Sequence, residues 1–282
     1  MHNTLILLTI LISLMATSPV SADYSENSNK TSWETVFFDD FDTFNEENWQ
    51  DQILWVNNEK QCYVRDNKYG TREVGDGTIK LKVINIGKEI DCDNVDKHGK
   101  KHPPTKYVAG RIASKNRKEF VGGKWTARLR VLDHGQNGMF PAWWLLGARN
   151  NEPPVEEEDE NICWPLVGSG EVDIFEHHGE GGPGHYAVRV IKSQGECDKG
   201  DWLTPQKVVD ANLDEWHEYS AEWAEGDIIF RIDGKEVHRN IGYAKDLPEP
   251  FFAILNFAKI NDAPMEGEWV MEVDWVKYEK AK

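Results

Sequence analysis

The sequence lacks several features that would place it in a common class of protein. After the apolar run of residues 5–15, no stretch is hydrophobic enough to cross a bilayer. The chain contains no convincing internal repeat, no low-complexity linker and no long amphipathic helical pattern. These absences argue against a membrane-spanning protein, a repeat protein and a helical bundle.

Positive charge is also scarce. The 282 residues include 49 Asp and Glu but only 32 Lys and Arg, which gives a formal net charge of −17. Such a chain repels phosphate, so we expect no nucleic-acid partner and no anionic membrane surface as a partner. Strongly sulfated or uronic polysaccharides are disfavoured only weakly, because a local basic cleft can override the net charge.

The N-terminus has the form of a secretory signal. Residues 1–22 contain the apolar run of residues 5–15 and end in the small-residue cleavage site Val20-Ser21-Ala22. We therefore predict a secreted or periplasmic protein with no membrane attachment once the signal is removed. Residues 23–33 are polar and are predicted to be a flexible lead-in, and residues 34–282 suit one large β domain, expected to be a monomer.

Cysteine is rare, and its pattern excludes a zinc-ribbon type of site. The four cysteines are far apart and form no Cys-x-x-Cys pair. An even number in an exported chain predicts disulfides, for which three connectivities are possible. We favour Cys62–Cys92 and Cys163–Cys197, because the second pair would clip the acidic loop of residues 155–160 to a later loop.

Short strands dominate the part of the chain that remains. The stretches are alternating and separated by turn residues, which is typical of a β-sandwich or jelly roll. Asp233-Gly234, between two such stretches, predicts a hairpin with a type I′ turn. The predicted strands cover residues 34–38, 78–83, 107–113, 123–132, 139–146, 171–176, 185–191, 217–223, 227–232, 235–238, 251–257 and 269–278.

One of these strands, residues 170–176, carries three carboxylates among apolar residues. Glu171 and Asp173 share a face of a regular strand, and a β-bulge near residues 174–175 would bring Glu176 to that face. An acidic strand on a solvated sheet face is common in a chain this acidic. However, like charges at such close spacing raise one another's pKa, and a cluster of this kind is typical of an active site.

The twelve tryptophans indicate a second feature of such a site. Flat aromatic rings pack against the apolar faces of sugars, although any single Trp is more often a core residue. Trp143 and Trp144 point to opposite faces of their strand, so one is expected in the core and the other in a cleft. The sequence does not decide between them from alternation alone.

The order of these segments resembles glycoside hydrolase family 16, the β-jelly-roll enzymes that include laminarinases and lichenases. Glu171, Asp173 and Glu176 match the Glu-x-Asp-x-x-Glu signature of that family's bulged branch. The resemblance covers about residues 34–279. Other segments that resemble family segments, in the same order, are residues 37–41, 57–61, 107–112, 123–128, 140–146 and 272–276.

This resemblance implies an all-β fold, a jelly-roll sandwich of two curved antiparallel sheets with a substrate cleft on the concave face. It implies a retaining endo-glycosidase in which Glu171 is the nucleophile, Glu176 is the general acid and base, and Asp173 orients Glu171. The two glutamate carboxyl groups would then lie about 5–5.5 Å apart, as in retaining enzymes. No cofactor is required for this chemistry.

The resemblance also implies substrate contacts and a metal site. Asn57 and Arg111 would hydrogen-bond sugar hydroxyls, Trp144 would form a stacking floor, and Asn256 resembles another cleft residue. Many family members carry a structural calcium near the opening and closing strands, and the oxygen donors available there are Asp40 and Asp274. The acidic run of residues 156–160 is expected to be a solvated loop face.

The preferred partner is a polysaccharide, with a β-1,3 or mixed β-1,3/1,4 glucan as the leading substrate. Many family members have His-Gly-Thr-x-His after the acidic strand, whereas this chain has residues 185–189 with Arg189 in place of the second His. An arginine in the cleft would suit an anionic or differently linked sugar, and pairing of Arg189 with an acid outside the cleft is the equal alternative. The first alternative substrate is a galactan such as agar, carrageenan or porphyran. A transglycosylase and a non-catalytic glycan-binding protein on the same scaffold remain further alternatives.

Overall fold

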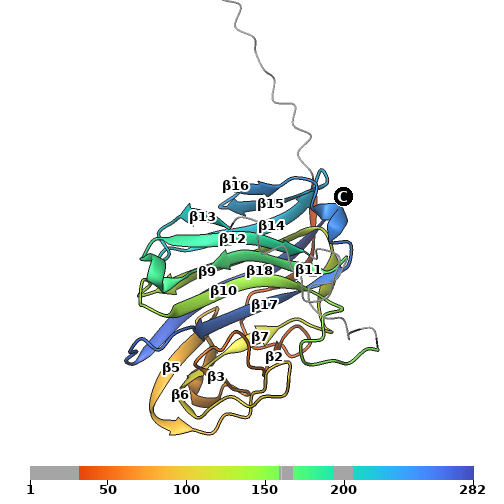
Figure 1. The fold of residues 1–282 in the computed structure, drawn as a ribbon. Coiled ribbons are helices and arrows are strands. Elements are labelled where there is room, and N and C mark those ends of the chain that lie inside the picture. Colours follow the sequence, from red (N-terminus) through yellow and green to blue (C-terminus); the bar gives the residue numbers. More distant parts are fainter. Residues whose placement is uncertain (1–31, 159, 161–167, 193–205) are drawn as a thin grey trace, which may run out of the picture. The chain divides into compact units, whose positions relative to one another are not determined.

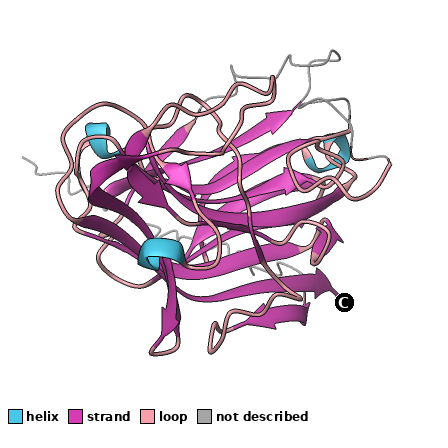
Figure 2. Ribbon diagram, turned by 90° about the horizontal axis from the view of Figure 1, so that it is seen from below, coloured by secondary structure: helices cyan, strands magenta, loops and turns pink. Residues whose placement is uncertain are grey.

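The computed structural model describes residues 32–158, 160, 168–192 and 206–282. Within these residues the regular secondary structure is almost entirely β-strand, and the strands form two large sheets (Figure 1). Figure 2 shows that the helical segments are single short turns among long strands. They are η1 (Lys68–Gly70), η2 (Gly179–Gly181) and η3 (Ala244–Asp246). In the described part of the chain, no helix is long and apolar enough to span a bilayer.

Among the described residues, the first sheet has ten strands, with the order β16-β15-β14-β9-β18-β5-β6-β3, while β1 pairs with β18 and β4 with β5. All of its pairs are antiparallel except β3 with β6. Its strands are β1 (Trp33–Asp39), β3 (Cys62–Tyr63), β4 (Arg72–Gly75), β5 (Thr78–Ile90), β6 (Thr105–Ala109), β9 (Lys124–Leu132), β14 (His217–Ala224), β15 (Asp227–Ile232), β16 (Lys235–Asn240) and β18 (Glu268–Ala281).

The second sheet, as far as the structure describes the chain, has eight strands in the order β13-β12-β11-β10-β17-β7-β2, and β8 pairs with β17. All of its pairs are antiparallel. Its strands are β2 (Gln50–Asp51), β7 (Arg111–Ala113), β8 (Glu119–Val121), β10 (Met139–Gly147), β11 (Gly170–Glu176), β12 (His185–Lys192), β13 (Lys207–Asp210) and β17 (Pro250–Lys259). This confirms the predicted all-β jelly-roll sandwich.

The main core lies between the two sheets and is rich in aromatic side chains. Trp125 of β9 and Trp143 of β10 are fully buried, and their rings meet edge to face at 6.3 Å. The indole of Trp143 also donates to the carbonyl of Tyr219 on β14, at 3.3 Å. These contacts join the two sheets through their inner faces. They leave the opposite face of the eight-stranded sheet available for a site.

Local sequence signals account for several connections. The Asp233-Gly234 hairpin joins β15 to β16, and both turn residues have positive φ (49° and 77°), as a type I′ turn requires. Strand β1 begins at Trp33, beside the predicted domain start at residue 34. The predicted signal peptide and most of the lead-in lie outside the described residues.

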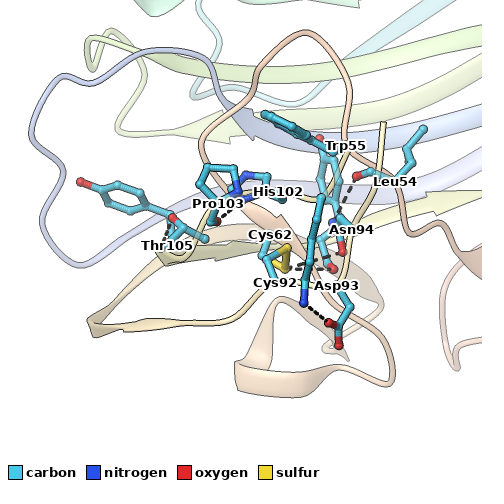
Figure 3. The surroundings of a disulfide bond; sticks show 12 residues. Leu54, Trp55, Cys62, Cys92, Asp93, Asn94, His102, Pro103 and Thr105 are labelled. Atoms are coloured by element: carbon cyan, nitrogen blue, oxygen red, sulfur yellow. Dashed lines mark hydrogen bonds and ion pairs between the residues drawn. A yellow bond between two sulfur atoms is a disulfide. The ribbon is translucent and has the colours of Figure 1, made fainter. Parts of the chain in front are cut away.

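The Cys62–Cys92 disulfide is present, as predicted, and it joins β3 to the loop that follows β5. Figure 3 shows its surroundings, which include Trp55 and His102. The other predicted pair, Cys163–Cys197, lies outside the described residues.

Replacing both Cys62 and Cys92 by alanine is expected to lower the free energy of unfolding by about 3–4 kcal/mol. The bridge closes a loop with a sequence separation of 30, and losing it frees that loop in the unfolded chain. Urea unfolding without reductant measures the change. Val121→Ala, at a side chain exposed on β8, is the control and should stay within about 0.5 kcal/mol. Equal midpoints for the double variant and the unmodified protein would contradict the expectation.

Candidate active site

The acidic strand β11 contains a β-bulge at the predicted place. Against β10, Asp173 pairs with Trp144 and Phe175 pairs with Trp143, so Ile174 has no partner of its own. Against β12, Asp173 pairs with Arg189 and the pairing resumes only at Glu176. Ile174 and Phe175 are therefore both buried in the core, and Glu176 returns to the face of Glu171 and Asp173.

These three acids lie at a pocket of about 970 Å³ on the outer face of the eight-stranded sheet. The volume is at the upper end of what is usual for ligand sites. One wall comes from residues 54–59 and 95–98, and another from residues 150–153. The pocket brings together all the residues that the sequence predicted for catalysis and substrate binding, namely Glu171, Asp173, Glu176, Asn57, Arg111, Trp144 and Asn256.

Burial dominates the electrostatics of the acids. It raises the pKa of Glu171 to about 8, an effect that Glu176 increases and the Asp173 side chain opposes through a hydrogen bond. Burial and the neighbouring Glu171 raise the pKa of Asp173 well above its usual range. The hydrogen bond between Glu171 and Asp173 lowers the pKa of Glu171 and raises that of Asp173.

The protonated form of Glu176 is favoured by the same effects. Burial and the Asp173 carboxyl group raise the pKa of Glu176 well above its usual range, and Arg189 opposes them. One face of the strand therefore offers Glu171, which is assisted in ionising by a hydrogen bond, and Glu176, which keeps its proton. When Glu171 is ionised and Glu176 is protonated, the pair can supply a nucleophile or base on one side of a bond and a proton on the other.

The structure decides between the two neighbouring tryptophans. Trp143 lies in the core, whereas Trp144 lines the pocket and donates from its indole nitrogen to Oδ1 of Asn256 at 2.8 Å. Asn256 in turn donates from Nδ2 to the hydroxyl of Tyr63 at 3.3 Å. The guanidinium of Arg111 lies over the Trp144 ring, 5.0 Å from its centroid. The Trp144 ring is thus fixed at its edge and over one of its faces.

Arg111 itself is more constrained than the sequence indicated. Its side chain is 2% exposed, and its Nε donates to Oε1 of Gln52 at 2.7 Å. Its Nη2 pairs with Oε2 of Glu152 at 2.9 Å. Two of its donors are therefore used within the protein, where they orient Glu152 in the pocket wall. Asn57, by contrast, is exposed on the pocket rim in a left-handed conformation with φ of 51°.

Glu59 is a pocket residue that the sequence reasoning missed. It is 4% exposed, and burial raises its pKa to about 7 against the opposing effects of Arg111 and of hydrogen bonds from Gln61 and Tyr63. It lies within the polar run of residues 57–61, which resembles a family segment. The signal that could have found it is an acidic residue flanked by the amides of Asn58 and Gln61 in a segment expected to line the cleft. Its burial depends on partners that are distant in sequence, which the run does not reveal.

The acidic loop is solvated at residues 156–158, as expected, but Glu160 departs from that expectation. Glu160 is 3% exposed and pairs with the fully buried Lys115 at 3.0 Å. The ammonium group of Lys115 also donates to the carbonyls of Asn150 and Glu152, at 2.7 and 2.5 Å. One buried cation therefore holds the loop that forms a wall of the pocket.

Replacing Lys115 by methionine is expected to destabilise the protein by about 3–5 kcal/mol, because the Glu160 carboxylate then stays buried without a cation to pair with. Adding Glu160→Gln removes that charge, so the double variant should be more stable than Lys115→Met alone. A double-mutant cycle in urea measures both effects. Additive losses would show that the two side chains do not interact.

The two carboxylates expected to bind calcium, Asp40 and Asp274, each have another partner in the structure. Asp274 is engaged by Arg128 in an ion pair, and Asp40 accepts from the backbone of Asp42. Among the described residues, no group of three or more His, Cys, Asp or Glu is arranged to hold a metal ion. Calcium near Asp40 and Asp274 stays an untested prediction.

The two histidines that follow the acidic strand lie in different surroundings. His178 lines the pocket, whereas His177 is buried and its Nδ1 bonds to the carbonyl of His185 at 2.7 Å. Burial lowers the pKa of His177 to about 4, so its ring is neutral at pH 7. His178 is therefore the one of the pair that can meet a ligand.

Comparison with known proteins identifies the family. The model for glycosyl hydrolases family 16 matches residues 59–253, more than half of the chain. The chain belongs to glycosyl hydrolase family 16. The matched residues include strand β11 with its bulge and the pocket wall formed by residues 150–153.

Named relatives in family 16 are distant. Glucan endo-1,3-beta-glucosidase A1 of Niallia circulans is 27% identical over 222 residues, which is 72% of this chain and 28% of that protein. Endo-1,3-1,4-beta-glycanase ExsH of Rhizobium meliloti (strain 1021) is 21% identical over 86% of this chain and 50% of its own length. The chain thus spans half or less of the curated relatives that it matches.

A solved structure matches this chain over nearly its whole length. LamAcat from Zobellia galactanivorans is 25% identical, and the alignment covers 87% of this chain and 97% of that one, with a TM-score of 0.72. The two chains therefore share the family 16 fold over most of their length.

Proposed function

We propose that this family 16 protein is a retaining endo-β-glucanase that hydrolyses β-1,3 or mixed β-1,3/1,4 glucan. The observation that carries the proposal is the bulged strand β11, which presents Glu171, Asp173 and Glu176 to one pocket beside Trp144. The relatives from Niallia circulans and Rhizobium meliloti are named for 1,3 and 1,3-1,4 linkages, which supports this choice of glucan.

The reaction would proceed in two displacements. Glu171 attacks the anomeric carbon while Glu176 protonates the departing glycosidic oxygen, which forms a covalent glycosyl-enzyme. Glu176, now ionised, then removes a proton from water, and the water releases the sugar from Glu171. Asp173 is the positioning residue, because its hydrogen bond to Glu171 favours the ionised form of that carboxyl group.

Export is part of the proposal. A disulfide such as Cys62–Cys92 persists in oxidising surroundings, which favours a secreted or periplasmic enzyme acting on a polymer outside the cell.

A galactan is the second candidate substrate, and Arg189 is the observation that favours it. This residue lines the pocket opposite Asp173, and its Nε is buried without a hydrogen-bond partner in the described structure. A guanidinium in this position suits a sulfated galactan such as carrageenan or porphyran.

Purified protein is expected to release reducing ends from laminarin or barley glucan, with the β-anomer appearing first in proton NMR. Glu171→Gln should abolish this activity, and Glu176→Gln should lower it by about 10²–10⁴-fold, while both variants stay folded. Agarose, carrageenan and porphyran are assayed in parallel. Activity on these polymers alone would replace the glucan with the galactan, and an initial α-anomer would exclude retention.

The pH profile of kcat/KM is expected to lie above the range of ordinary carboxyl groups, because the pKa values of Glu171 and Glu176 are both raised. The acid limb reports ionisation of Glu171, and the alkaline limb reports loss of the Glu176 proton, within a coupled set. Asp173→Asn removes a charge that raises the pKa of Glu176, so its alkaline limb should move to lower pH.

Arg189→Gln provides the opposite change, since Arg189 lowers the pKa of Glu176 and its removal should move the alkaline limb to higher pH. Initial rates on one soluble glucan across about pH 4 to 10, at about 0.15 M salt, measure both shifts. Movement of both variants in the same direction would refute the assignment of Glu176 as the proton donor.

A further inference from the structure

A small hairpin, formed by residues 93–102, borders the pocket on the side of the disulfide. Its two arms pair through Asn94 with His102, at 2.8 Å, and through a bridge between Val95 and Lys101. At its tip, Oδ1 of Asp96 accepts from the backbone nitrogens of His98 and Lys100, at 2.9 and 2.8 Å. These local bonds give the tip a defined shape although it lies at the surface.

The hairpin presents surface suited to a sugar chain. Val95 is 46% exposed and lines the pocket, as do Asp96 and the exposed His98. Next to them the pocket is lined by Asn57 and Asn58, which are exposed as well. An exposed apolar side chain among amide, carboxylate and imidazole groups matches a sugar ring, which has apolar C–H faces and hydroxyl edges.

The base of the hairpin is attached to the segment of residues 54–59, which forms the rest of this pocket wall. The backbone nitrogen of Trp55 donates to the carbonyl of Val95 at 2.8 Å. Nδ2 of Asn94 donates to the carbonyl of Leu54 at 3.1 Å (Figure 3). The rings of Trp55 and His102 meet edge to face at 5.0 Å. Both rings also place a nitrogen at the carbonyl of Glu59, at 3.0 and 3.1 Å.

The disulfide joins this hairpin to the segment that holds Asn256 and Trp144 in the pocket. Cys92 lies just before the hairpin, and Cys62 lies beside Tyr63, whose hydroxyl accepts from Asn256. Asn256 holds the indole nitrogen of Trp144. One covalent bridge thus fixes the hairpin relative to the chain of side chains that orients the Trp144 ring.

We propose that the hairpin of residues 93–102 is the wall of a distal glycan subsite, which the Cys62–Cys92 bridge holds in place. The inference rests on the proposed glucanase function and adds a determinant of chain-length preference to it. Long chains contact the hairpin as well as the acids, whereas the shortest cleaved chains contact only the acids and Trp144. The hairpin therefore lowers the KM for long chains.

The test measures kcat and KM for a series of glucan oligomers of increasing length, cleaved by the full chain. The variants are Val95→Ser combined with His98→Ala, at the hairpin, and Cys62→Ala combined with Cys92→Ala, at the bridge. Val121→Ser is the matched control, because Val121 is 58% exposed on β8 and does not line the pocket. Circular dichroism establishes that each variant is folded at the assay temperature.

The hairpin variant should raise KM for long oligomers about 5- to 10-fold, the effect of losing one or two sugar contacts, with kcat within about twofold. The KM for the shortest cleaved oligomer should change less than about twofold. The bridge variant should give the same dependence on length, and the control should give none.

A KM for long oligomers that the hairpin variant leaves unchanged would overturn the subsite, as would an equal loss for all lengths. The hairpin variant keeps the bridge, so it decides the question even where the bridge variant does not fold. An unmodified protein that cleaves no oligomer would refute the proposed function itself, which separates that failure from failure of the subsite.

Discussion

Burial of three carboxyl groups on one face of a strand is the constraint on which the site depends. Removing Glu171, Asp173 and Glu176 from water disfavours their ionised forms, and their closeness adds mutual repulsion. The strand accommodates them by sharing a proton between Glu171 and Asp173 and by placing Arg189 opposite Asp173. The resulting set carries less negative charge than three independent acids would, while one member remains available for each chemical role.

The pocket walls also contain buried charged groups, and these are stabilised by ion pairs. Arg111 and Lys115 lie close together in sequence, in strand β7 and the turn after it, and both reach the loop of residues 150–160. Each buried cation has a carboxylate partner, Glu152 for the first and Glu160 for the second. Because the cost of an unpaired buried charge is high, breaking either pair would be unfavourable. The two ion pairs thus tie the polar wall of the pocket to strand β7 and the turn after it.

Much of this arrangement could be predicted from local sequence. Strand alternation separated Trp143 from Trp144, the spacing of the acids required a bulge, and Asp233-Gly234 specified its turn. Contacts between distant segments, such as Arg111 with Glu152, could not be predicted, because no local pattern records which side chains meet in the folded chain.

The same limit applies in part to cysteine pairing, and it applies to the shortest strands. Three connectivities were possible from the sequence, of which the favoured Cys62–Cys92 pair is confirmed by the fold. Strands β2 and β3 were missed because two residues carry no periodicity. Both are defined by the partner strands against which they pair, β7 and β6.

The fixed Trp144 ring has a consequence for the thermodynamics of ligand binding. Its indole nitrogen is bonded to Asn256 and its face lies against the Arg111 guanidinium before any ligand arrives. A flat molecule that stacks on the free part of this ring therefore does not have to immobilise it. The entropy lost on association falls mainly on the ligand, so this platform favours stiff chains over flexible ones.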